Sequence, residues 1–252
     1  MLSRTPAEMS EVRGPASRAL ALAVEQSVKD RVRTLREGMA VASAARARPT
    51  SGMAMHRPVT IEVECRLGRR EKEERVAGVG VDAFRHIRTW LESSGWRCVD
   101  KNEFWDVTCH SEILSTPVRA RLTPGMMVVD ATVKTPVLSK TLCSSRVSVA
   151  TEATVRGSRK AMNEIETSAL AVCDGERQGW VRFKRRETFA LPSDDSKVVV
   201  DLTVVRQGKD MRSSVLTPPV YEVEIEAVDP CDAEVSRVFK VHDILSAIVG
   251  KM

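Results

Sequence analysis

Charged and apolar residues alternate along two short stretches that lie far apart in the chain. Residues 221–226 read Tyr-Glu-Val-Glu-Ile-Glu, and residues 61–66 read Ile-Glu-Val-Glu-Cys-Arg. Successive side chains of a strand point to opposite faces, so each stretch predicts a strand with one apolar and one charged face. Glutamates at every second position repel one another. The pattern therefore indicates two acidic strands facing one another with cations between them, as in a metal site.

Further strand-like segments, separated by turn residues such as Pro124-Gly125, follow from residue 96 onward. They lie at residues 96–99, 104–109, 118–122, 126–133, 147–155, 180–189, 197–205, 221–228 and 235–241. Many short strands with few helices between them predict a mainly β (α+β) fold, an eight-stranded antiparallel β-barrel with a few flanking helices. Helices are expected after Asp82, at 158–172 and at 242–249, with Gly95 ending the first.

The chain is expected to divide into an extension and one catalytic domain. Residues 1–57 are predicted to be a helical or partly disordered N-terminal extension, with helical spacing of apolar residues from about 15 to 47. Acidic residues within it, such as Glu8 and Glu11, argue against a mitochondrial presequence. Residues 58–252 form the predicted domain. Its charged block at 69–75 is typical of a solvated turn.

Composition narrows the class of partner. The chain has 252 residues and a formal net charge of +5, which favours acidic partners such as nucleic acid or phosphorylated metabolites. Its six cysteines are scattered without a C-x-x-C pair, so no structural zinc site is expected. A reducing, intracellular location, nuclear or cytoplasmic, is the default. No apolar run approaches the roughly 20 residues of a membrane span, so no membrane association is expected.

Charges at alternate positions also mark three other predicted strands. They are Arg182, Lys184 and Arg186; Asp201 and Thr203; and Arg146 with Ser148 and Ala150. One interpretation is a wetted outer sheet face with Glu paired to Lys and Arg, each pair worth at most about 1 kcal/mol. The other is a barrel with a polar channel, in which carboxylates bind Mg²⁺ or Mn²⁺ and basic groups bind phosphate.

Taken in order, these segments resemble a known family. The set comprises residues 61–68, 146–149, 183–186, 201–203 and 222–226. It is similar to the yeast-type RNA 5′-triphosphatases of mRNA capping, which are triphosphate tunnel metalloenzymes, and the short length suggests the trypanosomatid-like branch. The two glutamate strands in combination are the most specific part.

The resemblance implies an eight-stranded antiparallel tunnel and assigns roles to matching residues. Glu62, Glu64 and Glu226 match the glutamates that coordinate the divalent metal. Glu222 and Glu224 match the remaining tunnel glutamates, Arg146, Lys184 and Arg186 match the cations that hold the γ-phosphate, and Asp201 and Thr203 match the strand beside them.

The sequence departs from the family at two places. Val199 stands where the family has an Arg, so that contact is missing or supplied by Lys197 or Lys134. The family also uses a glutamate on an intervening strand to position the attacking water. Here Glu164, Glu166 and Glu176 are all candidates, and the choice between them stays open.

The implied activity is metal-dependent removal of the γ-phosphate from 5′-triphosphate RNA, the first step of mRNA capping, with NTP or tripolyphosphate as side substrates. A guanylyltransferase is then an expected partner. The alternatives are a tunnel-fold tripolyphosphatase or thiamine-triphosphatase, and a non-catalytic polyanion-binding capping scaffold.

Several other residues that invite a functional role are expected to be structural. The four histidines lie in unrelated contexts, and Cys65 is expected to be a small buried hydrophobe. The four tryptophans, Trp90, Trp96, Trp105 and Trp180, are expected to lie in the core rather than to stack on bases.

Overall fold

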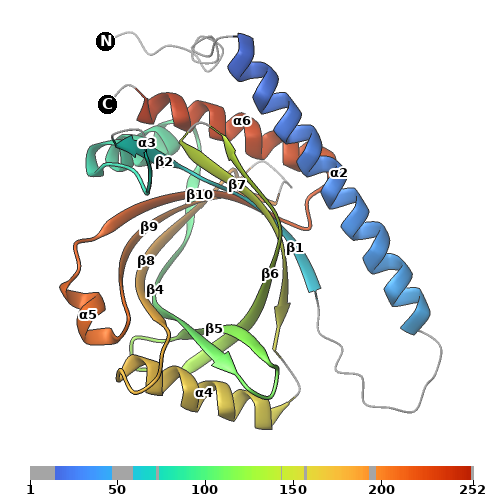
Figure 1. The fold of residues 1–252 in the computed structure, drawn as a ribbon. Coiled ribbons are helices and arrows are strands. Elements are labelled where there is room, and N and C mark those ends of the chain that lie inside the picture. Colours follow the sequence, from blue (N-terminus) through green and yellow to red (C-terminus); the bar gives the residue numbers. More distant parts are fainter. Residues whose placement is uncertain are drawn as a thin grey trace.

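Eight antiparallel strands close into a barrel, which confirms the predicted fold class (Figure 1). The computed structural model describes residues 15–46, 59–71, 74–142, 144–155, 158–192 and 197–250. Around the barrel the strand order is β1-β10-β9-β8-β4-β5-β6-β7. The strands are β1 (Val59–Arg66), β4 (Arg97–Ser111), β5 (Thr116–Leu122), β6 (Val128–Leu142), β7 (Ser145–Thr154), β8 (Trp180–Ala190), β9 (Val198–Gly208) and β10 (Val220–Val228).

Helices cover the outside of this barrel. They are α2 (Pro15–Arg46), α3 (Val81–Ser93), α4 (Arg159–Cys173), α5 (Met211–Leu216) and α6 (Asp232–Val249). In Figure 1, α6 and α3 lie over one side of the ring of strands, α2 runs along its flank, and α4 lies on the opposite side beside β5. Among the described residues, no helix is both long and apolar enough to cross a membrane.

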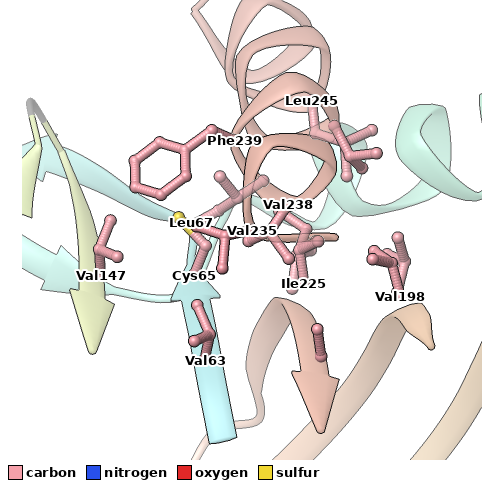
Figure 2. Close-up of a cluster of buried hydrophobic side chains, with 14 of the residues drawn as sticks. Val63, Cys65, Leu67, Val147, Val198, Ile225, Val235, Val238, Phe239 and Leu245 are labelled. Atoms are coloured by element: carbon pink, nitrogen blue, oxygen red, sulfur yellow. The ribbon is translucent and has the colours of Figure 1, made fainter. Parts of the chain in front are cut away.

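The hydrophobic core lies between the barrel wall and these helices. Beneath α6, the outward-facing Val63 and Cys65 of β1 and Ile225 of β10 pack against Val235 and Val238 of the helix (Figure 2). A second apolar cluster joins α4 to the outer faces of β4, β5 and β8. Because alternate residues of each strand face outward into these clusters, the charged residues between them are directed into the barrel. The predicted burial of Cys65 is confirmed.

The predicted C-terminal strand at residues 235–241 is wrong, because this segment belongs to helix α6. Val235, Val238, Phe239 and Leu245 are all buried. Their spacing of three and four residues is that of one helix face. The helix is also capped at its start, where the Glu234 side chain accepts a hydrogen bond from the Cys231 amide at 2.7 Å.

Strand lengths differ from the prediction in two places. The segments expected at 96–99 and 104–109 form one continuous strand, β4, with a register shift between Cys98 and Asp100. Strand β6 runs past the expected end at residue 133 to Leu142. Its pairing shifts between Pro136 and Leu138, and such a bulge lets a strand accommodate proline.

The N-terminal part of the domain also has more regular structure than expected. Within the charged block at 69–75, the described residues belong to two antiparallel strands that pair with one another, β2 (Gly68–Glu71) and β3 (Glu74–Ala77). Helix α3 begins after Gly80, so Asp82 lies in its first turn rather than at its cap. Helix α2 matches the predicted helix at 15–47. The rest of the predicted extension, residues 1–14 and 47–57, lies outside the described residues, and the domain division stays a prediction.

Candidate active site in the barrel lumen

The barrel encloses a cavity of about 700 Å³ whose lining comes from all eight strands. Its charged lining residues are Glu62, Glu64, Arg66, Asp106, Arg119, Arg121, Lys134, Arg146, Glu152, Arg182, Lys184, Arg186, Glu222, Glu224 and Glu226. Both carboxylates and cations line the wall. The lumen therefore differs from an apolar ligand pocket and from a channel lined by charges of one sign. Such a lining suits a ligand that carries both negative charge and divalent cations.

Strand register brings the two acidic strands together as neighbours. Glu64 of β1 lies directly opposite Glu226 of β10, and Arg66 lies opposite Glu224. On the other side of β10, Glu224 lies opposite Asp201 of β9. Directly opposed residues on one sheet face have Cβ atoms about 5 Å apart. The acidic residues therefore form one continuous wall of the lumen.

Arginines hold the outer members of this wall. Glu222 binds Arg182 at 2.7 Å and Arg66 at 3.6 Å, while Glu224 pairs with Arg66 and with Arg186. Burial opposes ionisation of Glu224, but Arg66 and Arg186 outweigh it and lower the pKa of its carboxyl to about 2. Glu222 and Glu224 thus orient cations that face the cavity.

Glu62 and Glu64 are less well neutralised. Lys134 of β6 reaches both, with Nζ 2.5 Å from Glu62 and 3.4 Å from Glu64, and Arg66 lies 3.2 Å from Glu64. Burial nevertheless raises the pKa of each carboxyl, and for Glu64 the neighbouring Glu224 raises it further. These two carboxylates lack sufficient positive charge, which is the condition that a bound divalent cation relieves.

Glu226 lies where two sets of carboxylates meet. Carboxylate oxygens of Asp201, Glu224 and Glu226 come within 4.8 Å of one another, a grouping that fits a metal ion. Burial raises the pKa of Glu226 well above its usual value, and a hydrogen bond with Asp201 adds to the effect. By register Glu226 also adjoins Glu64. Glu226 therefore belongs both to the group with Asp201 and Glu224 and to the pair with Glu64.

Strand β8, which β9 separates from β10, carries a buried lysine. Lys184 of β8 is 3% exposed and lies 2.6 Å from Asp106 of β4. Burial lowers the pKa of Lys184, and Asp106 offsets this only in part. Burial would raise the pKa of Asp106, but Lys184 and Arg119 bring it below its usual value. Asp106 therefore orients Lys184 toward the lumen.

The structure brings the nine residues predicted for the site into one region. Eight of them line the cavity: Glu62, Glu64, Arg146, Lys184, Arg186, Glu222, Glu224 and Glu226. Asp201 is buried behind the lining, where it binds Arg186 at 2.7 Å. Of the two lysines considered as substitutes at Val199, Lys134 lines the cavity, while Lys197 is exposed where β9 begins.

Sequence reasoning missed several lining residues. Asp106 on β4, Arg119 and Arg121 on β5, and Glu152 on β7 were not singled out, although all face the cavity. The signal was present, because these residues also alternate with buried apolar ones: Val118, Ala120 and Leu122 flank the two arginines of β5. Neither β4 nor β5 has alternating glutamates, and Glu152 is the single glutamate of β7, so no acidic repeat marks these positions in the sequence.

None of the three glutamates considered for positioning water lies in the cavity. Glu164 and Glu166 are on α4 outside the barrel, where Glu164 accepts a hydrogen bond from the Ser111 hydroxyl at 2.6 Å. Glu176 is exposed in the loop after α4. Glu152 is the glutamate that the structure adds to the lumen, 3.5 Å from both Lys134 and Arg119.

A closed antiparallel barrel with its core outside and alternating charges inside defines a class of β-tunnel proteins. Within that class, the chain shares its fold with the mimivirus capping enzyme triphosphatase. One structure of that protein aligns with a TM-score of 0.51 and 14% identity over 74% of this chain and 89% of that one. The RNA triphosphatase domain of the trifunctional mimivirus mRNA capping enzyme aligns with a TM-score of 0.51 and 11% identity. That alignment covers 82% of this chain and 94% of that one. No protein-family model matches the sequence, and neither does any curated protein.

Proposed function

We propose that this protein is a metal-dependent polynucleotide 5′-triphosphatase that removes the γ-phosphate from 5′-triphosphate RNA. The observation that carries the proposal is the lumen, in which glutamates of β1 and β10 share one cavity with cations from β5, β6 and β8. A polyphosphate with a divalent cation is the ligand that satisfies both sets of charges at once. The fold shared with the mimivirus RNA triphosphatase domain supports the same conclusion.

Glu62, Glu64 and Glu226 are the residues we assign to the metal, which is Mg²⁺ or Mn²⁺. Their carboxylates adjoin one another by register, and among the lumen glutamates described they have raised pKa values. Glu224 fits a ligand role less well because Arg66 and Arg186 outweigh its burial and lower the pKa of its carboxyl. The same arginines lie 3.2 Å from Glu64 and 3.7 Å from Glu226, but the pKa values of those two carboxyls stay raised. When bound, the cation would supply Lewis-acid stabilisation of a phosphoryl oxygen.

The basic residues of the lumen then act on the phosphate. Phosphoryl transfer spreads negative charge over the phosphoryl oxygens in the transition state, so catalysis depends on positioning and electrostatic stabilisation. Lys184 and Arg186 neutralise that charge, and they are held in place by Asp106 and Asp201 respectively. Glu152 lies in the lumen on β7, the strand next to β1, where it shares Lys134 with Glu62. We assign to it the orientation of the attacking water.

The product of this reaction is a 5′-diphosphate end, which is the chemical form that a guanylyltransferase requires in mRNA capping. The proposed place in the sequence of reactions is therefore the first step of capping. NTPs carry the same triphosphate group and are expected as side substrates.

The decisive experiment measures phosphate release by the purified protein from γ-labelled triphosphate RNA. We expect release with Mg²⁺ or Mn²⁺ and its loss when the cation is chelated. Inorganic tripolyphosphate is added as a competitor and as a separate substrate. Preferential turnover of tripolyphosphate would instead identify an inorganic tripolyphosphatase. If the protein binds these polyanions but hydrolyses none with either metal, the proposal is wrong and a non-catalytic polyanion binder remains.

A further inference from the structure

Trp180 occupies a position that the sequence did not predict. It was expected in the core, but it is 44% exposed and lines the edge of the cavity. All other Trp, Tyr and Phe side chains that the structure describes are buried or half-buried. An exposed tryptophan that also lines a cavity lies where that cavity meets the protein surface. Trp180 therefore marks one mouth of the lumen.

The basic residues of the same strand lie deeper along the same face. Trp180 begins β8, and Arg182, Lys184 and Arg186 follow it at alternate positions. Lys184 is four residues from Trp180, which corresponds to about 13 Å along a strand. That separation is of the order of the span from a γ-phosphate to the base of a nucleoside triphosphate. A triphosphate bound at Lys184 thus has room to place its nucleoside beside Trp180.

A further cation lies at the same end of the barrel. Arg146 is near the start of β7, opposite Arg66 of β1, and it lines the cavity. Its Nε is buried without a hydrogen-bond partner, and no carboxylate among the described residues pairs with its guanidinium. Most other cations of the lumen are engaged by carboxylates. Arg146 is therefore available to bind phosphate oxygens in the lumen.

The exposed strand end beside Trp180 is basic as well. Val181 pairs with Gly208 of β9, so Lys209, which follows Gly208 and is exposed, lies next to Trp180. Together the mouth offers an aromatic face with positive charge beside it. That combination is typical of sites where a base stacks and the adjoining backbone is held by charge.

We propose that Trp180 stacks on the base of the first nucleoside of the substrate and so selects nucleoside triphosphate ends over inorganic polyphosphate. This inference rests on the proposed triphosphatase function and adds a residue that determines specificity. Stacking tolerates any base, because every base has a π-face. The expected preference is therefore for the presence of a nucleoside and not for a particular sequence.

The test compares two apolar substitutions of similar size, Trp180→Phe and Trp180→Leu. Only the first retains an aromatic face. Binding of non-hydrolysable imido analogues of ATP, of triphosphate RNA and of inorganic tripolyphosphate is measured by calorimetry with Mg²⁺. We expect Trp180→Leu to weaken binding of the ATP analogue and of RNA by about five- to a hundredfold, the range for loss of one base–aromatic stack. Trp180→Phe should retain most of the affinity.

The third ligand separates this inference from the proposed function. Tripolyphosphate has no base, so its dissociation constant should change by less than about twofold in either variant, well below the effect of one lost stack. Equal weakening of all three ligands would show that Trp180 shapes the mouth without contacting a base, and wild-type affinity of Trp180→Leu for the ATP analogue would also overturn the inference. Both results are read from binding alone. Hydrolysis assays test the proposed function separately, and their failure leaves the stacking result interpretable.

Discussion

The two faces of strand β10 have opposite chemistry. Val223 and Ile225 face outward and are completely buried under the covering helices. Glu222, Glu224 and Glu226 alternate with them and face the cavity. A single strand therefore contributes to the hydrophobic core with one face and to the candidate active site with the other.

The outer face of the strand contributes to the stability of the fold, and the inner face carries the residues of the candidate active site. Apolar burial stabilises a fold in proportion to the area removed from water, and here that area lies outside the barrel wall. Buried charges oppose folding unless they are paired and hydrogen-bonded. We therefore expect the outer face to determine whether the chain folds, and the inner face to determine what the folded protein does.

The largest expected effect comes from neutralising the acidic wall at Glu226. Glu226→Gln preserves the shape of the side chain but removes a proposed metal ligand, and Glu62→Gln and Glu64→Gln do the same. We expect each variant to lower metal-dependent γ-phosphate release by more than about a hundredfold, since even outer-shell changes at metal sites cost up to that factor. The melting temperature should stay the same or rise, because like-charge repulsion falls.

The matched control is Glu103→Gln on β4. Its side chain points away from the cavity, is about half exposed and pairs with Arg185. It should retain wild-type activity. Full activity in any of the three lumen variants would refute the assigned metal site.

Ile225→Ala should give the reverse result. Its side chain is fully buried between β10 and α6, and replacing such a residue by alanine costs about 2–5 kcal/mol because a cavity remains. Urea unfolding should show this loss of stability, while the activity of the folded fraction is retained. If Ile225→Ala abolished turnover without destabilising the protein, the two faces would not be independent.

Arg186→Ala tests whether one inner cation is needed for the reaction. Arg186 binds Asp201 at 2.7 Å and lies near Glu224 and Glu226. Loss of one preorganised group that stabilises developing charge typically lowers the rate about 10²- to 10³-fold. We expect kcat to fall by that order under saturating RNA. An unchanged kcat would mean that the γ-phosphate binds elsewhere in the lumen.

The inner faces were the most predictable part of the structure. Alternation placed Glu62, Glu64, Lys184 and Glu226 on the charged faces of their strands, and the resemblance to the tunnel family predicted that these faces line a lumen. Alternation does not indicate which strands are neighbours, so the ion pair between Lys134 and Glu62 could not be predicted from the sequence. That contact depends on β6 lying next to β7, and β7 next to β1.

Other errors have local causes. The strand expected to end at residue 133 continues through a bulge at Pro136, and such a bulge has no sequence signature of its own. In the C-terminal segment, Val235 and Val238 fit a short apolar run as well as one face of a helix. The difference is decided by packing against Ile225 and the outer barrel wall. Trp180 was expected to be buried because tryptophan usually is, and its place at the first residue of β8 could not be read from composition.

The pH dependence of stability should also distinguish the two faces, with a smaller effect. Burial raises the pKa of Glu62, Glu64 and Glu226 above the usual 4.5. In that range the folded protein binds more protons than the unfolded chain, so the free energy of unfolding falls as pH rises from 4.5 through the raised pKa values. Melting temperatures measured without metal should decline over this window. Mn²⁺ or Glu226→Gln should flatten the decline, and a profile that neither alters would contradict the assignment.

The smallest expected effect comes from Arg185→Ala, one residue away from Arg186 on the same strand. Arg185 faces outward and binds Glu103 at 2.7 Å, but its side chain is 66% exposed. Exposed pairs of this kind contribute about 0.2–1 kcal/mol. We therefore expect a barely measurable change in the urea midpoint and wild-type phosphate release. The two neighbouring arginines then form a direct test of the comparison, because they share a strand and a side-chain chemistry and differ in the face they occupy. A loss of activity in Arg185→Ala as large as that in Arg186→Ala would mean that charge anywhere on β8, rather than charge inside the lumen, supports the reaction.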